Sequence, residues 1–404
     1  MGHNQRRFLM LQGPHGPFFR KLGQMLRQSG SDVWRVGFNM GDRAFWGQAD
    51  QYIAYTGGMT DWQVTCAHIL AEKRITDLVV YGDSRPVHAT AISLARAQGV
   101  TVHVFEEGYL RPYWATYERG GSNGNSRLMH TSVADMTAAL GRSHIEVHES
   151  PTNWGSMYSH VVYGFLYHLM ILLANKPYRA MRSHRELPVA KEFWTAFQRI
   201  LLTPFVNIHR NVKTRQIARG GYPYHLVLMQ LEHDSAFQDH SPFHTMPDFL
   251  ETVICGFAKG APGHHHLVFK AHPLESGRRP LRRTAKQIAR KYGVAARVHY
   301  VPGGKLARIL DNARTAITVN STAAQQVLWR GIPLKIFGAS VYDKPEFVSD
   351  VDIVDFFKHP TRPDTNAYRD YRQYLLETSQ VSGGFYSAGG RRQLLRQVVD
   401  MMLS

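Results

Sequence analysis

Residues 77–108, DLVVYGDSRPVHATAISLARAQGVTVHVFEEG, decide the fold class of this chain. The apolar run at 77–81 predicts a buried strand, and residues 87–98, which follow a turn, predict a helix. A second apolar strand is expected at 100–105, and it ends in two glutamates. Short apolar strands that alternate with helices are typical of a parallel, doubly wound α/β sheet.

The same alternation continues on both sides of this stretch. Before it, strands are expected at 8–12 and 33–38, with a helix that reaches residue 28 between them. After residue 220, strands are expected at 225–230, 267–271, 298–301, 315–319 and 333–337, and helices at 245–259, 281–292, 305–312 and 322–330. Two such sheets that face each other form the GT-B architecture of two Rossmann-like domains, with an active site in the cleft between them.

The middle of the chain separates the two alternating halves. Residues 127–215 lack strand signals, are rich in aromatic and basic residues, and are expected to be helical. The run Gly220-Gly221-Tyr222-Pro223 interrupts any regular element. We therefore expect an N-terminal Rossmann-like domain at 1–219 and a C-terminal Rossmann-like domain at 220–404.

The charge of the chain is strongly basic and uneven. Its 404 residues include 48 Lys and Arg against 31 Asp and Glu, a formal net charge of +17. Ten basic and two acidic residues lie within 176–219, and eight basic residues and no acid within 278–297. Such patches attract anionic membranes, acidic glycans, nucleotide donors or nucleic acid. A plainly solvated face is the alternative for each patch.

Three observations indicate a cytoplasmic protein. No secretory signal is visible at the polar N-terminus. The most apolar segment, residues 161–174, is too short to span a membrane and contains His168. Cys66 and Cys255 match no metal or redox spacing, so we expect buried thiols in a reducing compartment.

The acidic pair Glu106-Glu107 is the first candidate for chemistry. In open α/β sheets, ligands bind beyond the carboxyl ends of the strands, and Gly108 would allow a sharp turn there. Adjacent acids near Arg111 can have pKa values that are pushed apart, so that one acts as a general acid or base. A surface turn with an arginine salt bridge is the alternative.

Two further motifs follow expected strands in the second half. Proline holds His272 extended in His272-Pro273, and this histidine could donate to a phosphate oxygen. Ser321 and Thr322 open a helix, where capping and phosphate binding are compatible. The histidine tract 264–266 is not expected to bind a metal, because consecutive side chains do not easily face one ion.

Two loops complete the candidate site. Asp234 follows the first strand of the second half, and a carboxylate there could act as a nucleophile opposite a second acid, as a retaining glycosyl transfer requires. A loop or N-cap aspartate is the alternative. The small-residue loop that contains Gly13, His15 and Gly16 would let a ligand approach backbone N–H groups, although it is not a Walker loop.

Taken together, these motifs resemble the capsule polysaccharide β-Kdo transferases of the KpsS/LipB type. The matching stretches are QGPHGPFF at 12–19, EEGYLRPYWATYE at 106–118, QLEHDSAFQDHS at 230–241, HP at 272–273 and NSTAAQQVLWRGIPLKIFG at 320–338. The resemblance implies a GT-B fold, a CMP-β-Kdo donor and transfer of Kdo to a lysophosphatidylglycerol-type acceptor. That reaction starts the poly-Kdo linker of a capsule at the cytoplasmic face of the inner membrane.

The resemblance also implies roles for individual residues. Asp234 would be the nucleophile, and Glu107, rather than Glu106, the acid/base. The residues that would bind the CMP donor are His272, Pro273, Ser321, Thr322, Lys270 and Gln230. The residues that would contact the acceptor, or form the loop beside it, would be Gly13, His15, Gly16 and Arg111. No metal or other cofactor is expected.

Other functions stay open. The same trio of motifs is similar to that of bacterial sialyltransferases, which use a related CMP-ulosonate donor. The chain could instead be a non-catalytic scaffold of the capsule assembly and export complex, or could work alongside other proteins of that complex. Nucleic-acid binding is not expected, because no nucleic-acid module is recognised.

Overall fold

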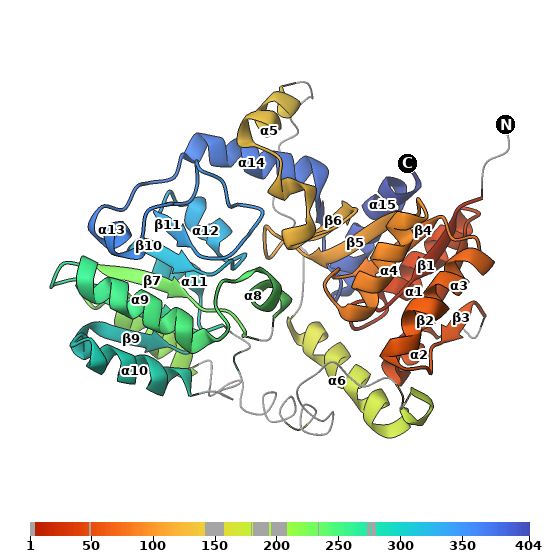
Figure 1. Ribbon diagram of the computed structural model, residues 1–404, viewed down its shortest axis with the longest axis horizontal. Helices are drawn as coiled ribbons and strands as arrows, with labels where there is room; N and C mark the ends of the chain where they lie inside the picture. The colour runs from red at the N-terminus through yellow and green to blue at the C-terminus, as the bar shows by residue number, and fades with distance from the viewer. Residues whose placement is uncertain are drawn as a thin grey trace. The chain divides into compact units, whose positions relative to one another are not determined.

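The fold was analysed in a computed structural model, which describes residues 5–47, 50–141, 157–178, 180, 194, 208–232, 234–272, 275 and 280–404. The chain forms two compact units (Figure 1). Unit 1 comprises Met1–Arg127, Glu146–Leu201 and Leu376–Ser404, and unit 2 comprises Leu128–Ile145 and Leu202–Leu375.

Unit 1 is built on a seven-stranded sheet in the order β12-β6-β5-β4-β1-β2-β3. The strands are β1 (Arg7–Met10), β2 (Asp32–Gly37), β3 (Tyr52–Ala54), β4 (Asp77–Tyr81), β5 (Thr101–Glu107), β6 (Trp114–Arg119) and β12 (Gln380–Ser382). Its helices are α1 (Phe18–Gln28), α2 (Met40–Trp46), α3 (Trp62–Glu72), α4 (Pro86–Ala97), α6 (Met157–Ala174) and α15 (Ala388–Leu403). Strands β1 to β5 are parallel to one another, and β6 runs antiparallel between β5 and β12.

Helices cover both faces of this sheet, and the sequence of β1 shows why. Successive side chains in a strand point to opposite faces. Phe8 and Met10 accordingly pack into a core under α1 and α15, whereas Leu9 and Leu11 pack into a second core under α3 and α4. A strand buried on both faces reads as a continuous apolar run, which is how the parallel strands were predicted.

Unit 2 has a five-stranded, fully parallel sheet in the order β11-β10-β7-β8-β9. The strands are β7 (Tyr224–Leu228), β8 (His266–Lys270), β9 (Val298–Val301), β10 (Ala313–Thr318) and β11 (Leu334–Ile336). The helices are α5 (Val133–Leu140), α8 (Ser235–His240), α9 (Met246–Gly260), α10 (Leu281–Lys291), α11 (Leu306–Leu310), α12 (Ala324–Leu328), α13 (Ile353–Lys358) and α14 (Thr365–Thr378), the last of which ends within unit 1. Residues 208–218 are also helical.

Both sheets have the Rossmann strand order. In each unit the first strand lies at the centre, the next two lie on one side, and the following two lie on the other. The order reverses between β1 and β4 in unit 1 and between β7 and β10 in unit 2. Ligands of such sheets bind at these switch points, beyond the carboxyl ends of the strands. The predicted α/β fold with two Rossmann-like sheets is therefore confirmed.

The division of the chain differs from the predicted boundary at 219/220. Residues 376–404 were assigned to the C-terminal domain, but they lie in unit 1. Strand β12 pairs with β6, and Leu394, Leu395 and Val398 of α15 fill the core under α1. A strand of three residues is too short to show a periodic pattern, so the return of the chain to this sheet could not be predicted from the sequence. Residues 128–145, expected in the N-terminal domain, lie in unit 2.

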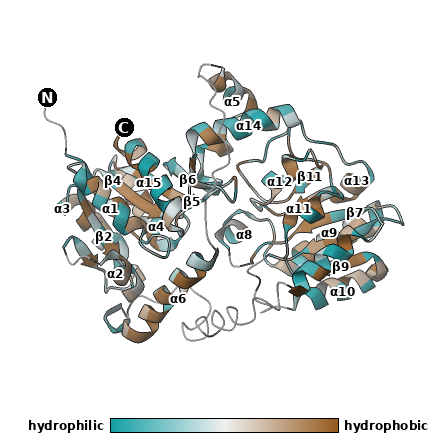
Figure 2. Ribbon diagram, turned by 180° about the vertical axis from the view of Figure 1, so that it is seen from behind, coloured by the Kyte–Doolittle hydropathy of each residue, from teal (hydrophilic) through white to brown (hydrophobic). Residues whose placement is uncertain are grey.

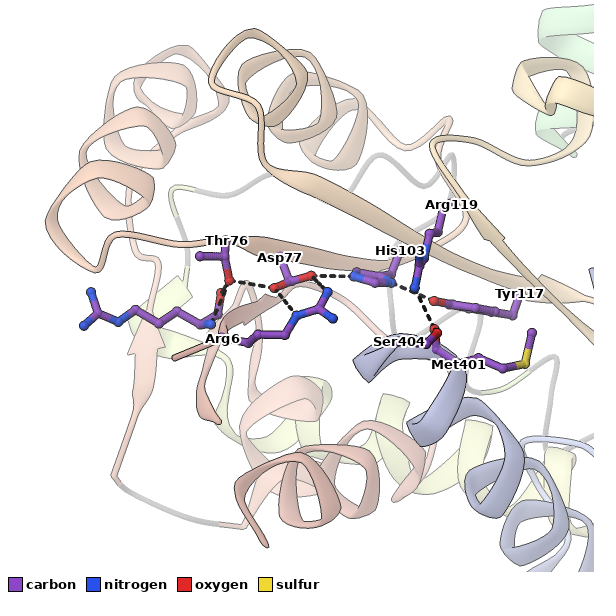
Figure 3. A network of polar contacts seen from close by, with 9 residues as sticks. Arg6, Thr76, Asp77, His103, Tyr117, Arg119, Met401 and Ser404 are labelled. Carbon is purple, nitrogen blue, oxygen red and sulfur yellow. Dashed lines mark hydrogen bonds and ion pairs between the residues drawn. The ribbon is translucent and has the colours of Figure 1, made fainter. Parts of the chain in front are cut away.

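A buried polar network ties the starts of three strands of unit 1 together (Figure 3). Asp77 Oδ1 lies 2.8 Å from His103 Nε2, and Asp77 accepts hydrogen bonds from Arg6 and Thr76. His103 Nδ1 in turn lies 2.8 Å from the Tyr117 hydroxyl. Burial alone would raise the pKa of Asp77, but these hydrogen bonds outweigh it and lower the pKa to about 2.

Replacing Asp77 with alanine is expected to destabilise the chain by about 3 kcal/mol, because it leaves buried donors without an acceptor. An acid with a lowered folded pKa adds stability above its unfolded pKa. This stability should therefore be lost as pH falls from about 4 towards 2. Chemical denaturation across this pH range measures both effects. Asp32→Ala, which removes the half-buried partner of Arg7 at an Nε–Oδ2 distance of 3.8 Å, is the control and should cost under about 1 kcal/mol. Equal losses in both variants would contradict the prediction.

Candidate functional site

The acidic pair lies at the carboxyl end of β5, as expected. Both Glu106 and Glu107 are half-buried, and the Glu107 backbone N–H donates to Glu106 Oε1 over 3.0 Å. Gly82, which ends β4, lies against Glu106 and has a φ of +71°, a left-handed conformation that favours glycine. The pair thus stands one strand away from the switch point of unit 1.

Burial raises the pKa of Glu106 to about 7. The Glu107 N–H bond opposes this shift, the Glu107 charge adds to it, and Arg111 and Arg85 oppose it weakly. A carboxyl group with a pKa near 7 gains and loses its proton near neutral pH. It is therefore suited to general acid or base catalysis.

Glu107 has a different environment, made by aromatic side chains. The Tyr81 hydroxyl donates to Glu107 Oε1 over 2.8 Å, and Tyr386 also hydrogen-bonds to Glu107. The His160 ring lies 4.2 Å from the Tyr386 ring, centroid to centroid. Burial lowers the pKa of His160, and Glu107 opposes that shift. Segments far apart in sequence, at 81, 160 and 386, thus converge on one carboxylate.

The turn after the acids is fixed by β12. Gln380 Oε1 accepts the backbone N–H of Tyr109 over 2.9 Å, and Gln380 Nε2 donates to Thr116. A Cβ at Gly108 would overlap the carbonyl oxygen of Trp114, so close approach, rather than a positive φ, requires glycine there. Arg111 is exposed, and its Nε donates to the Gly108 carbonyl over 3.2 Å.

The loop after β1 lies under α6. Gly16 has a φ of +112° and contacts Tyr163, and the His15 ring stacks on the Tyr167 ring at 4.4 Å. Gly13 instead packs against Phe19 of the core. Of the three predicted loop residues, His15 and Gly16 contact α6, and Gly13 serves packing.

The switch point of unit 2 holds a buried amide pair. Gln230, after β7, donates from Nε2 to Asn320 Oδ1 over 2.7 Å, and its Oε1 accepts the Asn320 backbone N–H over 2.9 Å. Ser321 and Thr322 are half-buried beside this pair, and Ser321 Oγ accepts the N–H of Ala323. The expected helix begins at Ala324 rather than at Thr322, so neither hydroxyl residue is its N-cap.

Two other predicted donor residues lie at the carboxyl end of β8. Lys270 is buried, and His272 is half-buried two residues beyond it. Pro273 lies outside the described residues. Burial and the nearby Arg210 guanidinium lower the pKa of Lys270 to about 8.

Asp234 is exposed at the start of α8, where its backbone carbonyl accepts the N–H groups of Phe237 and Gln238. The position is at the carboxyl edge of the unit 2 sheet, three residues beyond the buried Leu231. An exposed carboxylate at such an edge is accessible to a ligand.

The histidine tract divides between two separate partners. His265 Nδ1 lies 3.0 Å from Nε2 of the buried His225, and His266 Nδ1 lies 2.8 Å from His299 Nε2. Within the described residues, no three His, Cys, Asp or Glu side chains are grouped as a metal site would need. The tract packs at the amino ends of β7 and β8, away from the predicted site.

Sequence comparison identifies the family. A family model described as capsule polysaccharide biosynthesis protein matches residues 76–386, which include the acidic pair and the donor motifs. The chain belongs to this family. The predicted family is therefore confirmed, at the level of capsule polysaccharide proteins of the KpsS/LipB type.

Two relatives match along nearly their whole length. The capsule polysaccharide export protein KpsS of Escherichia coli is 29% identical over 389 residues, covering 94% of this chain and 97% of the relative. The capsule polysaccharide modification protein LipB of Neisseria meningitidis serogroup B is 27% identical over 385 residues, covering 94% and 91%. Among solved structures, the chain is similar to Thermosulfurimonas dismutans KpsC, a beta Kdo 2,7 transferase, with 11% identity, 98% and 100% coverage and a TM-score of 0.45.

Sequence reasoning missed the residues that support the acids. Tyr81, His160, Gln380 and Tyr386 come from four separate segments and carry no shared motif. Only Tyr81 had a local signal, because it ends an apolar strand next to the one that carries the acids. The other three reach the site through β12 and α6, whose positions depend on tertiary packing.

Proposed function

We propose that this chain is a retaining glycosyltransferase that moves Kdo from CMP-β-Kdo to a lysophosphatidylglycerol-type lipid and so starts the poly-Kdo linker of a capsular polysaccharide. The observation that carries the proposal is the half-buried Glu106 carboxyl group at the carboxyl end of β5, whose pKa is raised to about 7 by loss of contact with water. Membership of the capsule family supports the substrate class.

The proposed chemistry divides between the acids of the two units. Asp234 attacks the anomeric carbon of Kdo, and the bond to the CMP phosphate oxygen breaks. Because phosphate is a stable anion, it leaves without needing a proton. The acceptor hydroxyl then attacks the Kdo–Asp234 ester, and two inversions retain the configuration.

Glu106 is the better candidate for the base that takes the proton of the acceptor hydroxyl. A general base works best when its pKa lies near the working pH, and burial places that of Glu106 there. Glu107, bound by Tyr81 and Tyr386, is proposed to position and tune its neighbour. This assignment reverses the order that the resemblance implied.

The residues of unit 2 are proposed to hold the donor. Lys270, His272 and the Ser321-Thr322 hydroxyls offer a cation and hydrogen-bond donors to the CMP phosphate, with the Gln230–Asn320 pair fixing the strand ends. These groups could stabilise the departing nucleotide without a metal.

Sugar transfer is therefore expected to continue in excess EDTA, because side chains of the protein stabilise the negative charge of the departing phosphate. Product formation after extensive dialysis against the chelator measures this, and a metal-dependent glycosyltransferase serves as the control. Loss of activity that Mg²⁺ or Mn²⁺ restores would contradict the metal-free mechanism.

A peripheral position at the cytoplasmic face of the inner membrane is part of the proposal. Helix α6 is largely apolar (Figure 2), and Tyr158, Leu166, Leu172 and Leu173 are exposed on it. Exposed basic residues lie along α10 of unit 2. Apolar insertion and attraction to anionic lipid reinforce each other at such surfaces. Within the described part of the chain, no helix has the length and apolar character needed to cross a bilayer.

The test is mass spectrometry of the purified chain incubated with CMP-Kdo, generated in place, and fluorescent lysophosphatidylglycerol. A product heavier by one Kdo supports the proposal. Product formation with a CMP-sialic acid donor instead would favour the second candidate, another CMP-ulosonate transferase. Failure with both donors and no CMP binding would favour a non-catalytic scaffold of the capsule complex.

A further inference from the structure

Lys270 is a buried cation with no counter-ion in the described structure. It is 7% exposed, and its ammonium group makes no hydrogen bond or ion pair with any residue in the described ranges. An ion taken out of water costs several kcal/mol unless a charge or hydrogen bonds compensate it. A lysine in this state therefore indicates that a partner is missing.

A second cation lies beside it. Arg210 projects from helical residues 208–218, and its Nε donates to the Pro302 carbonyl over 2.7 Å. Lys270 pairs in register with Val301, directly before this turn, and the two positive groups repel each other electrostatically. No acidic side chain contributes to the lowered pKa of Lys270. Two cations thus converge at the ends of β8 and β9.

Two glycines bring the backbone close to these side chains. Gly303 and Gly304 have φ values of +110° and +100°, and a Cβ at Gly303 would lie 3.0 Å from Arg210 Nε. Thr214, one helical turn after Arg210, lies against Gly304. The Thr214 hydroxyl is buried and has no hydrogen-bond partner within the described residues.

We propose that Lys270, Arg210 and Thr214, together with the Gly303-Gly304 turn, form a subsite for an oxyanion, either a phosphate or a carboxylate. The subsite deepens the proposed function, on which the identity of the ligand rests: CMP-Kdo carries both a nucleotide phosphate and a sugar carboxylate. An anion would pair with the Lys270 ammonium group, beside the Arg210 guanidinium, and accept a hydrogen bond from the Thr214 hydroxyl. Arg210 and Thr214 come from the segment before β7, which none of the donor motifs includes.

The experiment is calorimetric titration of the full chain with CMP, inorganic phosphate and free Kdo. Lys270→Met is expected to weaken binding of the anion that occupies the subsite by about 10- to 100-fold. Arg210→Met should weaken binding of the same anion. Lys305→Met is the matched control, because it removes an exposed cation from the same turn and should change little. Loss of CMP and phosphate binding identifies a phosphate subsite, and loss of Kdo binding alone identifies a carboxylate subsite.

Thermal melting separates a binding role from a structural one. Without ligand, Lys270→Met is expected to melt at the same or a higher temperature, because the uncompensated charge is removed. Unchanged binding of all three anions, or no binding by the wild-type chain, would overturn the subsite. If Lys270→Met does not fold, modification of wild-type Lys270 by an amine reagent, mapped by peptide mass spectrometry, provides the second measurement. A saturating concentration of the anion should slow the modification of Lys270 and leave that of Lys305 unaffected. Equal rates of Lys270 modification with and without the anion would reject the subsite.

The subsite and the proposed function can fail separately. Should the wild-type chain transfer no Kdo while Lys270→Met loses anion binding, the subsite stands and the function fails. Should transfer occur with an unchanged donor KM in Lys270→Met, the function stands and the subsite fails.

Discussion

Replacing Glu106 with glutamine is expected to reduce Kdo transfer by about 10²- to 10⁴-fold, the range typical of losing a general base. Glutamine keeps the size and one hydrogen-bond acceptor for the Glu107 N–H, but it cannot take a proton. The wild-type rate should rise with pH through about 7, because the base acts in its deprotonated form. In Glu106→Gln this rise should disappear from the residual rate.

Glu107→Gln is the matched control for this prediction. Since Tyr81 binds Glu107 and Glu107 is proposed to position its neighbour rather than to take the proton, we expect a smaller loss of kcat. The two roles would be exchanged if Glu107→Gln lost more kcat than Glu106→Gln and if the transfer rate of Glu106→Gln kept its pH dependence.

A stability measurement supports the same assignment without using activity. An acid whose folded pKa is raised binds its proton more tightly in the folded state than in the unfolded state. Stability should therefore fall as pH rises from about 4.5 to about 7. Glu106→Gln should remove this part of the pH dependence. Melting curves across this range check it, and an unchanged slope would show that Glu106 is not the titrating group.

Replacing Asp234 with asparagine is expected to reduce transfer by at least about 10³-fold, because an amide cannot form the sugar ester that a retaining mechanism needs. Asp234 is exposed at the start of α8, and asparagine caps a helix about as well as aspartate does. Stability and CMP binding should therefore stay close to those of the wild-type chain.

Trapping provides the direct measurement for Asp234. Wild-type chain incubated with CMP-Kdo and no acceptor should give a peptide that carries one Kdo on Asp234. Asp239→Asn is the matched control, because Asp239 is an exposed carboxylate on the same short helix. A Kdo adduct on another residue, or full activity in Asp234→Asn, would remove Asp234 from the nucleophile role.

Most strands of the two sheets could be predicted from the sequence alone. The predicted bounds of β4 and β9 agree with the structure, and those of β1, β2, β5, β7, β8 and β10 differ by one or two residues. Most of these strands are buried on both faces, and burial leaves a continuous apolar run in the sequence. The edge strand β9 differs, because only Val301 is buried in it. The polar residues that end the buried strands, including Glu106, Gln230 and His272, were found for the same reason.

The way in which remote segments complete the sheets and the site could not be predicted, because it depends on tertiary packing. Strands β3 and β12 have three residues each, too few for a periodic pattern, and β6 pairs antiparallel through a turn that Gln380 fixes. Convergence of Tyr81, His160 and Tyr386 on Glu107, and of Arg210 on Lys270, likewise depends on packing between segments distant in sequence. Local patterns record burial and period, whereas the pKa of an acid and the missing counter-ion of a lysine arise from what the fold places around them.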